Sequence, residues 1–155
     1  MTKSTAILLL TAVTLFSHAA YADIKPEDAI KFRKASYSAM SWNMGKIKAM
    51  TIDNPESFDA KQVGAAAAVI AAIANSGMGA LYVPGSESDI GDMTTRAKAE
   101  IFTDKAGVKE VAVNFIQAAN NLNKVAAGGD KIAIAQAFKD TGASCKACHD
   151  KYRKD

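Results

Sequence analysis

Apolar side chains recur every three or four positions in four stretches of this chain, residues 26–50, 59–75, 104–127 and 131–154. In the third stretch, for example, Val108, Val111, Phe115 and Leu122 fall on one side of a helical wheel. This period is typical of amphipathic helices, and no stretch shows the strict alternation of a half-buried strand. The sequence therefore predicts an all-α protein, an antiparallel four-helix bundle.

Turn signals separate the four stretches. Pro26 suits a first helical turn, and Glu27 and Asp28 favour the positive end of the helix dipole. Asp53-Asn54-Pro55 ends the first helix, and Gly128-Gly129-Asp130 breaks the third helix and caps the fourth. The remaining connection, through Pro84-Gly85, is roughly two dozen residues long, and loops of that length are usually functional or contain short helices. A helical turn is expected at residues 94–102.

The N-terminus has the three parts of a secretory signal peptide. Lys3 supplies the positive charge, residues 6–16 form an apolar core, and Ala20-Tyr21-Ala22 is a small-x-small cleavage site. A membrane anchor is the alternative, but a spanning helix needs roughly 20 apolar residues. We therefore expect cleavage after Ala22, an exported domain of residues 23–155, a periplasmic location and no stable membrane anchor.

Composition narrows the possible functions. Of the 155 residues, 49% are hydrophobic and 23% charged, so the chain can bury a core and is not disordered. The formal charge of +3 is too small and too scattered to indicate a nucleic-acid partner.

The only two cysteines form the pentapeptide Cys145-Lys146-Ala147-Cys148-His149 near the C-terminus. On a helix, residues three apart lie on one face, so each thiol can add to one vinyl group of a haem. His149 follows directly and can bind the iron, and this pentapeptide is the recognised c-type attachment pattern. The sequence predicts one covalent haem c, held by Cys145 and Cys148, with His149 as the iron ligand.

Two other uses of the cysteines are weaker. A redox dithiol usually follows a strand and opens a helix, and no strand is predicted here. A structural zinc ion needs four ligands, but after removal of the signal peptide, which contains His18, only three Cys and His side chains remain.

A haem site at the far C-terminus of a helical bundle resembles cytochrome c′, the class II cytochromes c. The resemblance covers residues 23–155 and includes the Lys25–Ala29 segment, the Pro84-Gly85 loop and the sequence around the haem pentapeptide. It implies that Arg153 lies near the proximal face of the haem, although a cation here also complements the helix dipole. It also implies that Arg33 pairs with a haem propionate. Judged from the residues alone, Arg33 can instead be a surface arginine whose stem covers apolar groups.

The resemblance further implies that the residue one helical turn after Arg33, Tyr37, faces the sixth position of the iron. Low-spin members of the family have Met there and high-spin members an apolar residue, so Tyr departs from both patterns. Tyr37 can ligate iron or pack its ring over the open position, and packing is the commoner behaviour. Met40 and Met44 lie on the same face, where methionine more often fills a core. Trp42 is interpreted as a core or interface residue.

These residues lead to one main function and two alternatives. The main expectation is a five-coordinate iron that binds diatomic gases (NO or CO), with protection against NO as a role implied by the family. A low-spin electron carrier, with Met40 or another side chain of the first helix as sixth ligand, is the first alternative. A weak peroxidase is the second, but no distal histidine exists to move protons, so no enzyme is expected. The family also implies a homodimer formed through the first two helices, and no redox partner is identified.

Overall fold

The computed structural model describes residues 24–155, and the predicted signal peptide with its cleavage site lies outside the described residues. The α-helices are α1 (Pro26–Lys48), α2 (Ala60–Ala74), α3 (Glu100–Thr103), α4 (Lys105–Gly128) and α5 (Lys131–Tyr152). No β-strand occurs within residues 24–155, where the only ladder-like contacts are isolated bridges. The prediction of an all-α fold is confirmed.

Local chemistry sets the ends of these helices. Pro26 occupies the first turn of α1. The side chains of Asp59, Asp104 and Asp130 cap α2, α4 and α5 by accepting hydrogen bonds from backbone amides of the first turn. Beyond Lys48 the chain continues as a π-helical turn, Ala49–Asp53, so the first helical segment extends slightly beyond its predicted end at residue 50.

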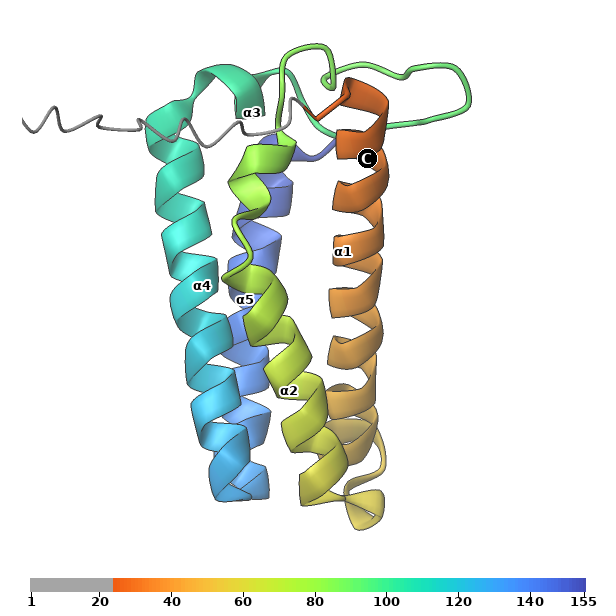
Figure 1. Cartoon of the computed structure of the whole chain (residues 1–155). Helices are drawn as coiled ribbons and strands as arrows, with labels where there is room; N and C mark the ends of the chain where they lie inside the picture. Colours follow the sequence, from red (N-terminus) through yellow and green to blue (C-terminus); the bar gives the residue numbers. More distant parts are fainter. Residues whose placement is uncertain (1–23) are drawn as a thin grey trace, which may run out of the picture.

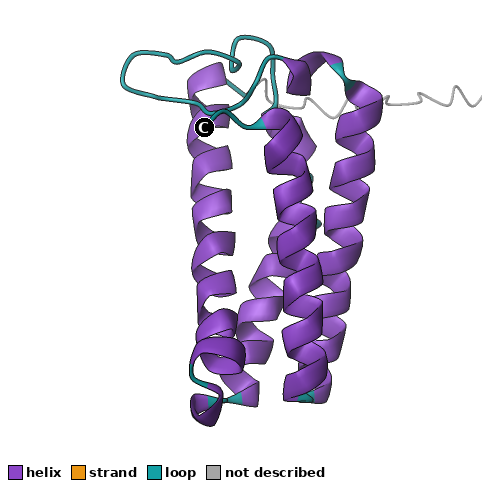
Figure 2. Ribbon diagram, turned by 180° about the vertical axis from the view of Figure 1, so that it is seen from behind, coloured by secondary structure: helices purple, strands orange, loops and turns teal. Residues whose placement is uncertain are grey.

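The four long helices form an antiparallel bundle (Figures 1 and 2). α1 packs on α2, α2 on α4 and α4 on α5, whereas the contact between α1 and α5 is much sparser. The start of α1, the end of α2, the start of α4 and the end of α5 meet at one end, at the top in Figure 1. The long connection between α2 and α4 lies over this same end.

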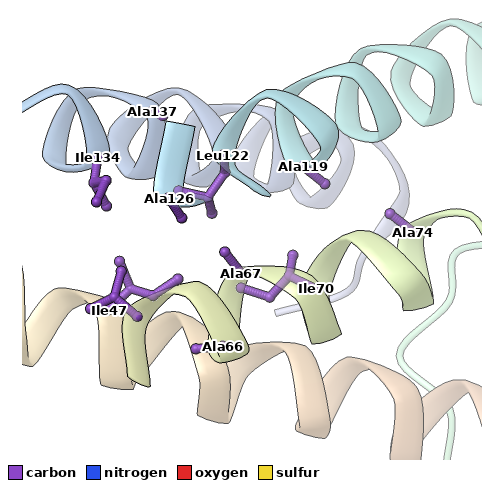
Figure 3. Packing of buried hydrophobic residues seen from close by; sticks show 11 residues of the cluster. Ile47, Ala66, Ala67, Ile70, Ala74, Ala119, Leu122, Ala126, Ile134 and Ala137 are labelled. Carbon is purple, nitrogen blue, oxygen red and sulfur yellow. The ribbon is translucent and has the colours of Figure 1, made fainter. Parts of the chain in front are cut away.

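The main core lies in the middle and lower part of the bundle. Figure 3 shows isoleucine, leucine and many alanine side chains from all four long helices pointing toward one another. Ile47 comes from α1, Ile70 from α2, Leu122 from α4 and Ile134 from α5, and all four are fully buried. The alanines let the helices approach closely, so side chains fill this part of the bundle. A site for a bound group is therefore expected at the other end, beneath the long connection. Within residues 24–155, no helix combines the length and apolarity needed to cross a bilayer.

The connection from α2 to α4 is ordered by short local structures. It contains a 3₁₀ turn, Met78–Leu81, and a turn in which the amide of Ser86 donates to the carbonyl oxygen of Val83. Gly85 has φ of 87° in that turn, a conformation that favours glycine. The helical turn predicted at residues 94–102 occurs only at the end of that segment, where α3 begins at Glu100.

Candidate functional site

The two cysteines lie one turn apart near the end of α5, and both are half-buried free thiols. Cys148 packs against a small upper cluster formed by Ile101, Val111 and Tyr152. Burial raises the pKa of both thiols, and the neighbouring Cys148 raises that of Cys145 further. A reactive dithiol normally has a lowered thiol pKa, so these surroundings do not favour the redox alternative.

His149 is exposed, whereas Cys145 and Cys148 of the same motif are half-buried. It follows Cys148 by one position, which turns its side chain about 100° around the helix axis. Its Nδ1 atom lies 3.3 Å from Nη1 of Arg153, so the predicted proximal residue Arg153 contacts the predicted iron ligand. Partial burial of the ring and the charges of Arg153 and Arg96 lower the pKa of His149. The neutral imidazole, the form that binds metals, is therefore favoured.

Arg33 is only 4% exposed, which excludes the surface arginine considered from the sequence. Its Nη1 donates to the carbonyl oxygen of Leu81 at 2.7 Å and to Oγ of Ser86 at 2.7 Å. Its Nη2 donates to the carbonyl oxygen of Ser86 at 2.8 Å and to Oγ1 of Thr95 at 3.3 Å. The guanidinium also lies 4.6 Å from the centre of the Tyr82 ring. Arg33 thus links α1 to the long connection through these hydrogen bonds. The pairing of Arg33 with a haem propionate stays a prediction.

Tyr37 lies one turn after Arg33, and its hydroxyl is 2.9 Å from the hydroxyl of Tyr82. Its ring is partly open to solvent, with 39% exposure, but burial of the phenol raises its pKa, and the nearby Tyr82 and Cys148 raise it further. The phenol is therefore neutral at ordinary pH. Tyr82 packs on the same small cluster as Cys148, so its hydrogen bond to Tyr37 connects α1 with the surroundings of the cysteines.

A cleft lies beside these residues at the upper end of the bundle. A cavity of about 360 Å³ is lined by Tyr82, Phe102 and Val108, among others. These three side chains pack on the same cluster as Cys148. A neighbouring cavity of about 410 Å³ is lined by Tyr82, Phe102 and Glu87, whose Oε2 atom is buried without a hydrogen-bond partner. The cleft adjoins Cys148 through this cluster, whereas His149 lines neither cavity. Two thiols one turn apart with an imidazole at the next position are the donor set that fits a covalently attached haem.

Tyr82, Phe102 and Ser86 were not found from the sequence. They lie in a connection without periodicity, and the only available signal was that a loop of this length is often functional. The zinc alternative gains no support either, because no three His, Cys, Asp or Glu side chains in the described part of the chain gather as a metal site.

A profile of the family named cytochrome c′ matches residues 28–153, nearly the whole of the described chain. The chain belongs to the cytochrome c′ family. As a member of the cytochrome c′ family it carries one covalent haem c, and its two cysteines are available for the attachment.

Relatives and solved structures agree with this assignment. The cytochrome c′ of Allochromatium vinosum is 52% identical over 145 residues, which are 93% of this chain and 92% of that protein. One solved cytochrome c′, described as having an unusual ligand-controlled dimer dissociation, superposes with a TM-score of 0.82 at 51% identity, covering 86% of this chain and 100% of that one. Nitric oxide and carbon monoxide complexes of cytochrome c′ mutants from Alcaligenes xylosoxidans superpose with TM-scores of 0.72 at 34% identity, covering 84% of this chain and 98% of each of those chains.

Proposed function

We propose that this protein is an exported haem protein that binds small diatomic gases, nitric oxide or carbon monoxide, at an iron with an open sixth position. In this proposal Cys145 and Cys148 hold the haem covalently and His149 ligates the iron. The bound haem would supply the iron to which a gas attaches. Arg153 and Arg33 would lie near the proximal face and a propionate, as the family resemblance implies.

The observation that carries this proposal is the protonation state of Tyr37. Its hydroxyl is hydrogen-bonded to that of Tyr82, and its raised pKa keeps the phenol neutral. Iron ligation by tyrosine, in contrast, requires a phenolate. A neutral ring at this position would cover the sixth position of the iron without ligating it. It would keep water from the iron, and an incoming gas would have to displace the ring.

The surroundings of the methionines argue against the electron-carrier alternative. Met44 packs against the main core, and Met40 is buried on α1. Both positions fit core filling, the usual use of methionine. With neither methionine nor Tyr37 assigned as a ligand, the open iron is the better-supported state.

The relatives extend the proposal. Cytochrome c′ mutants from Alcaligenes xylosoxidans have been solved with nitric oxide and with carbon monoxide. We infer the same ligand class for this chain, with protection against nitric oxide as its role and the periplasm, reached through cleavage after Ala22, as its location. Binding and not catalysis is proposed, because His149 is the only histidine after the signal peptide and no second imidazole can move protons.

The proposal also includes a homodimer formed through α1 and α2. α1 exposes Phe32 and Trp42, with Trp42 71% exposed, and α2 exposes Val69. A contiguous exposed apolar patch marks an association surface, and we infer that these side chains belong to one such patch on α1 and α2. A related cytochrome c′ is described as dissociating its dimer under ligand control, which supports a dimer here.

Mass spectrometry and an absorption spectrum test the proposal. We expect one haem that survives acid-acetone extraction on a chain beginning at Asp23. The ferrous protein should show high-spin bands that shift with carbon monoxide. Loss of haem on extraction would exclude covalent attachment, and a low-spin spectrum unchanged by carbon monoxide would favour the electron carrier.

A further inference from the structure

The last turn of α5, which follows His149, is fixed by the side chain of Tyr152. Tyr152 is 3% exposed, and its ring packs with Ile101 and Val111 in the upper cluster. Its hydroxyl donates to Oδ2 of Asp104 at 2.6 Å. A hydrogen bond to a carboxylate is short, strong and directional, so it fixes the orientation of the ring as well as its burial.

The carboxylate of Asp104, which accepts the hydrogen bond from Tyr152, is itself held in place. Asp104 is the N-cap of α4, and its Oδ1 accepts from the amide of Gly107 at 2.9 Å. A Cβ added at Gly107 would collide with both Oδ2 of Asp104 and the hydroxyl of Tyr152. The absence of a side chain at this position therefore leaves the space in which the tyrosine and the carboxylate meet.

Backbone hydrogen bonds connect the same turn to the long connection. The amide of Lys98 donates to the carbonyl oxygen of Tyr152 at 2.9 Å, and the amide of Lys154 donates to that of Arg96 at 2.8 Å. Within α5, the amide of Arg153 donates to the carbonyl oxygen of His149 at 3.0 Å. The backbone of His149 is thus hydrogen-bonded to the last turn of the helix. That turn is itself bonded to the long connection and to the start of α4.

We propose that Tyr152 is a positioning residue for His149, acting through the hydrogen bond from its hydroxyl to Asp104. The inference rests on the proposed role of His149 as the iron ligand. A helix end without tertiary contacts frays, and a frayed last turn would let the imidazole move toward or away from the iron. Bonded to the start of α4, the turn keeps the imidazole at one distance and one orientation.

Two substitutions remove the contact from opposite sides. Tyr152→Phe keeps the buried ring and removes the hydroxyl. Asp104→Ser keeps an oxygen that can cap α4 and removes the carboxylate. Gln136→Ala is the matched control, because it deletes an exposed hydrogen bond to Asp140 on the same helix, far from the last turn.

The experiment uses the haem-loaded protein and two measurements. Amide hydrogen exchange at Arg153 and Lys154 should become about tenfold faster in both variants, as expected for the loss of one good hydrogen bond, and should stay unchanged in Gln136→Ala. The iron–histidine stretching band of the ferrous protein, measured by resonance Raman spectroscopy, should broaden or shift in both variants and not in the control.

The outcomes separate a positioning role from a structural one. Faster exchange with an unchanged iron–histidine band would overturn the inference, because Tyr152 would then stabilise the turn without affecting His149. Unchanged exchange and an unchanged band would overturn it as well. A wild-type protein without any iron–histidine band would refute the assignment of His149 itself, and this inference with it.

Discussion

The hydroxyl oxygens of Tyr37 and Tyr82 lie 2.9 Å apart and join the first helix to the long connection at the candidate site. Burial raises the pKa of both phenols, so both are neutral and either can be the donor. Tyr82 is itself covered by the guanidinium of Arg33, at 4.6 Å from the ring centre. The position of the Tyr37 ring therefore depends on a loop residue that is far away in the sequence.

The first prediction concerns gas binding. Tyr37→Ala should bind carbon monoxide more tightly and faster, by roughly tenfold or more, because the incoming gas no longer displaces a packed ring. Tyr37→Phe keeps the ring, and Tyr82→Phe removes only the partner hydroxyl, so both should show smaller changes. Flash photolysis of the ferrous complex measures the rates. Equal rates in wild type and Tyr37→Ala would place Tyr37 away from the gas-binding side.

The second prediction concerns Arg33. Arg33→Leu should lower the free energy of unfolding by roughly 2–4 kcal/mol, because oxygen atoms of Leu81 and Ser86 lose a charged donor. Lys34→Leu is the matched control, since Lys34 is exposed and donates only to Thr94 at 3.2 Å. Urea unfolding followed by circular dichroism gives both values.

The same two variants test the propionate pairing. If Arg33 also compensates a propionate, the reduction potential of the haem should change in Arg33→Leu and not in Lys34→Leu. A lowered stability with an unchanged potential would mean that Arg33 serves only to anchor the long connection.

The fold could be predicted from the sequence because its determinants are local. Helical periodicity and caps such as Asp130 depend on residues three or four positions apart, and the four long helices lie where this pattern indicates. Trp42 shows the limit of that signal. A helical wheel identifies an apolar face but not its partner, and Trp42 is exposed on α1 instead of buried in the core.

The candidate site was only partly accessible to sequence reasoning. The cysteines and His149 form a contiguous motif, so they needed no structure to be found. The partners of Arg33 are loop atoms of Leu81, Ser86 and Thr95, 48 to 62 positions away, and nothing periodic marks them. The motif does not show that His149 is exposed, because that depends on the helix face: one residue beyond Cys148 turns the side chain by about 100° around the helix axis.

The third prediction concerns self-association. Trp42→Ser should weaken the proposed homodimer by at least about 30-fold in dissociation constant, because buried tryptophan is among the largest contributors to interfaces. Ile132→Ser is the matched control, since Ile132 is 81% exposed but lies on α5, outside the proposed surface. Sedimentation velocity over a range of concentrations measures both constants. Equal weakening in the two variants, or none in either, would contradict an interface on α1 and α2.

The last prediction concerns acid and uses the contact between Asp104 and Tyr152. The hydrogen bonds from the Tyr152 hydroxyl and the Gly107 amide hold the pKa of Asp104 below its ordinary value of 3.8. A carboxyl group whose pKa is lower in the folded state stabilises the fold above its unfolded pKa, and this stabilisation disappears as the pH falls through the folded value. On the alkaline side, the same contact raises the pKa of Tyr152 to about 12, so its contribution is complete below pH 10 and disappears as the pH rises through about 12.

A double-mutant cycle at several pH values tests the acid side of this dependence. Between pH 6 and 9, the effects of Asp104→Ser and Tyr152→Phe on the free energy of unfolding should not add, because each removes the same contact. The stabilisation should begin to fall as the pH drops below 3.8, where the unfolded chain takes up the proton first, and the coupling should approach zero only once the pH has passed the lower pKa of Asp104 in the folded state. Asp59→Ser is the control, because Asp59 caps α2 at the opposite end of the bundle, and its effect should add to that of Tyr152→Phe at every pH (Figure 1). A coupling that stays constant as the pH falls through both the unfolded and the folded pKa of Asp104 would show that the tyrosine and the carboxylate interact through packing alone.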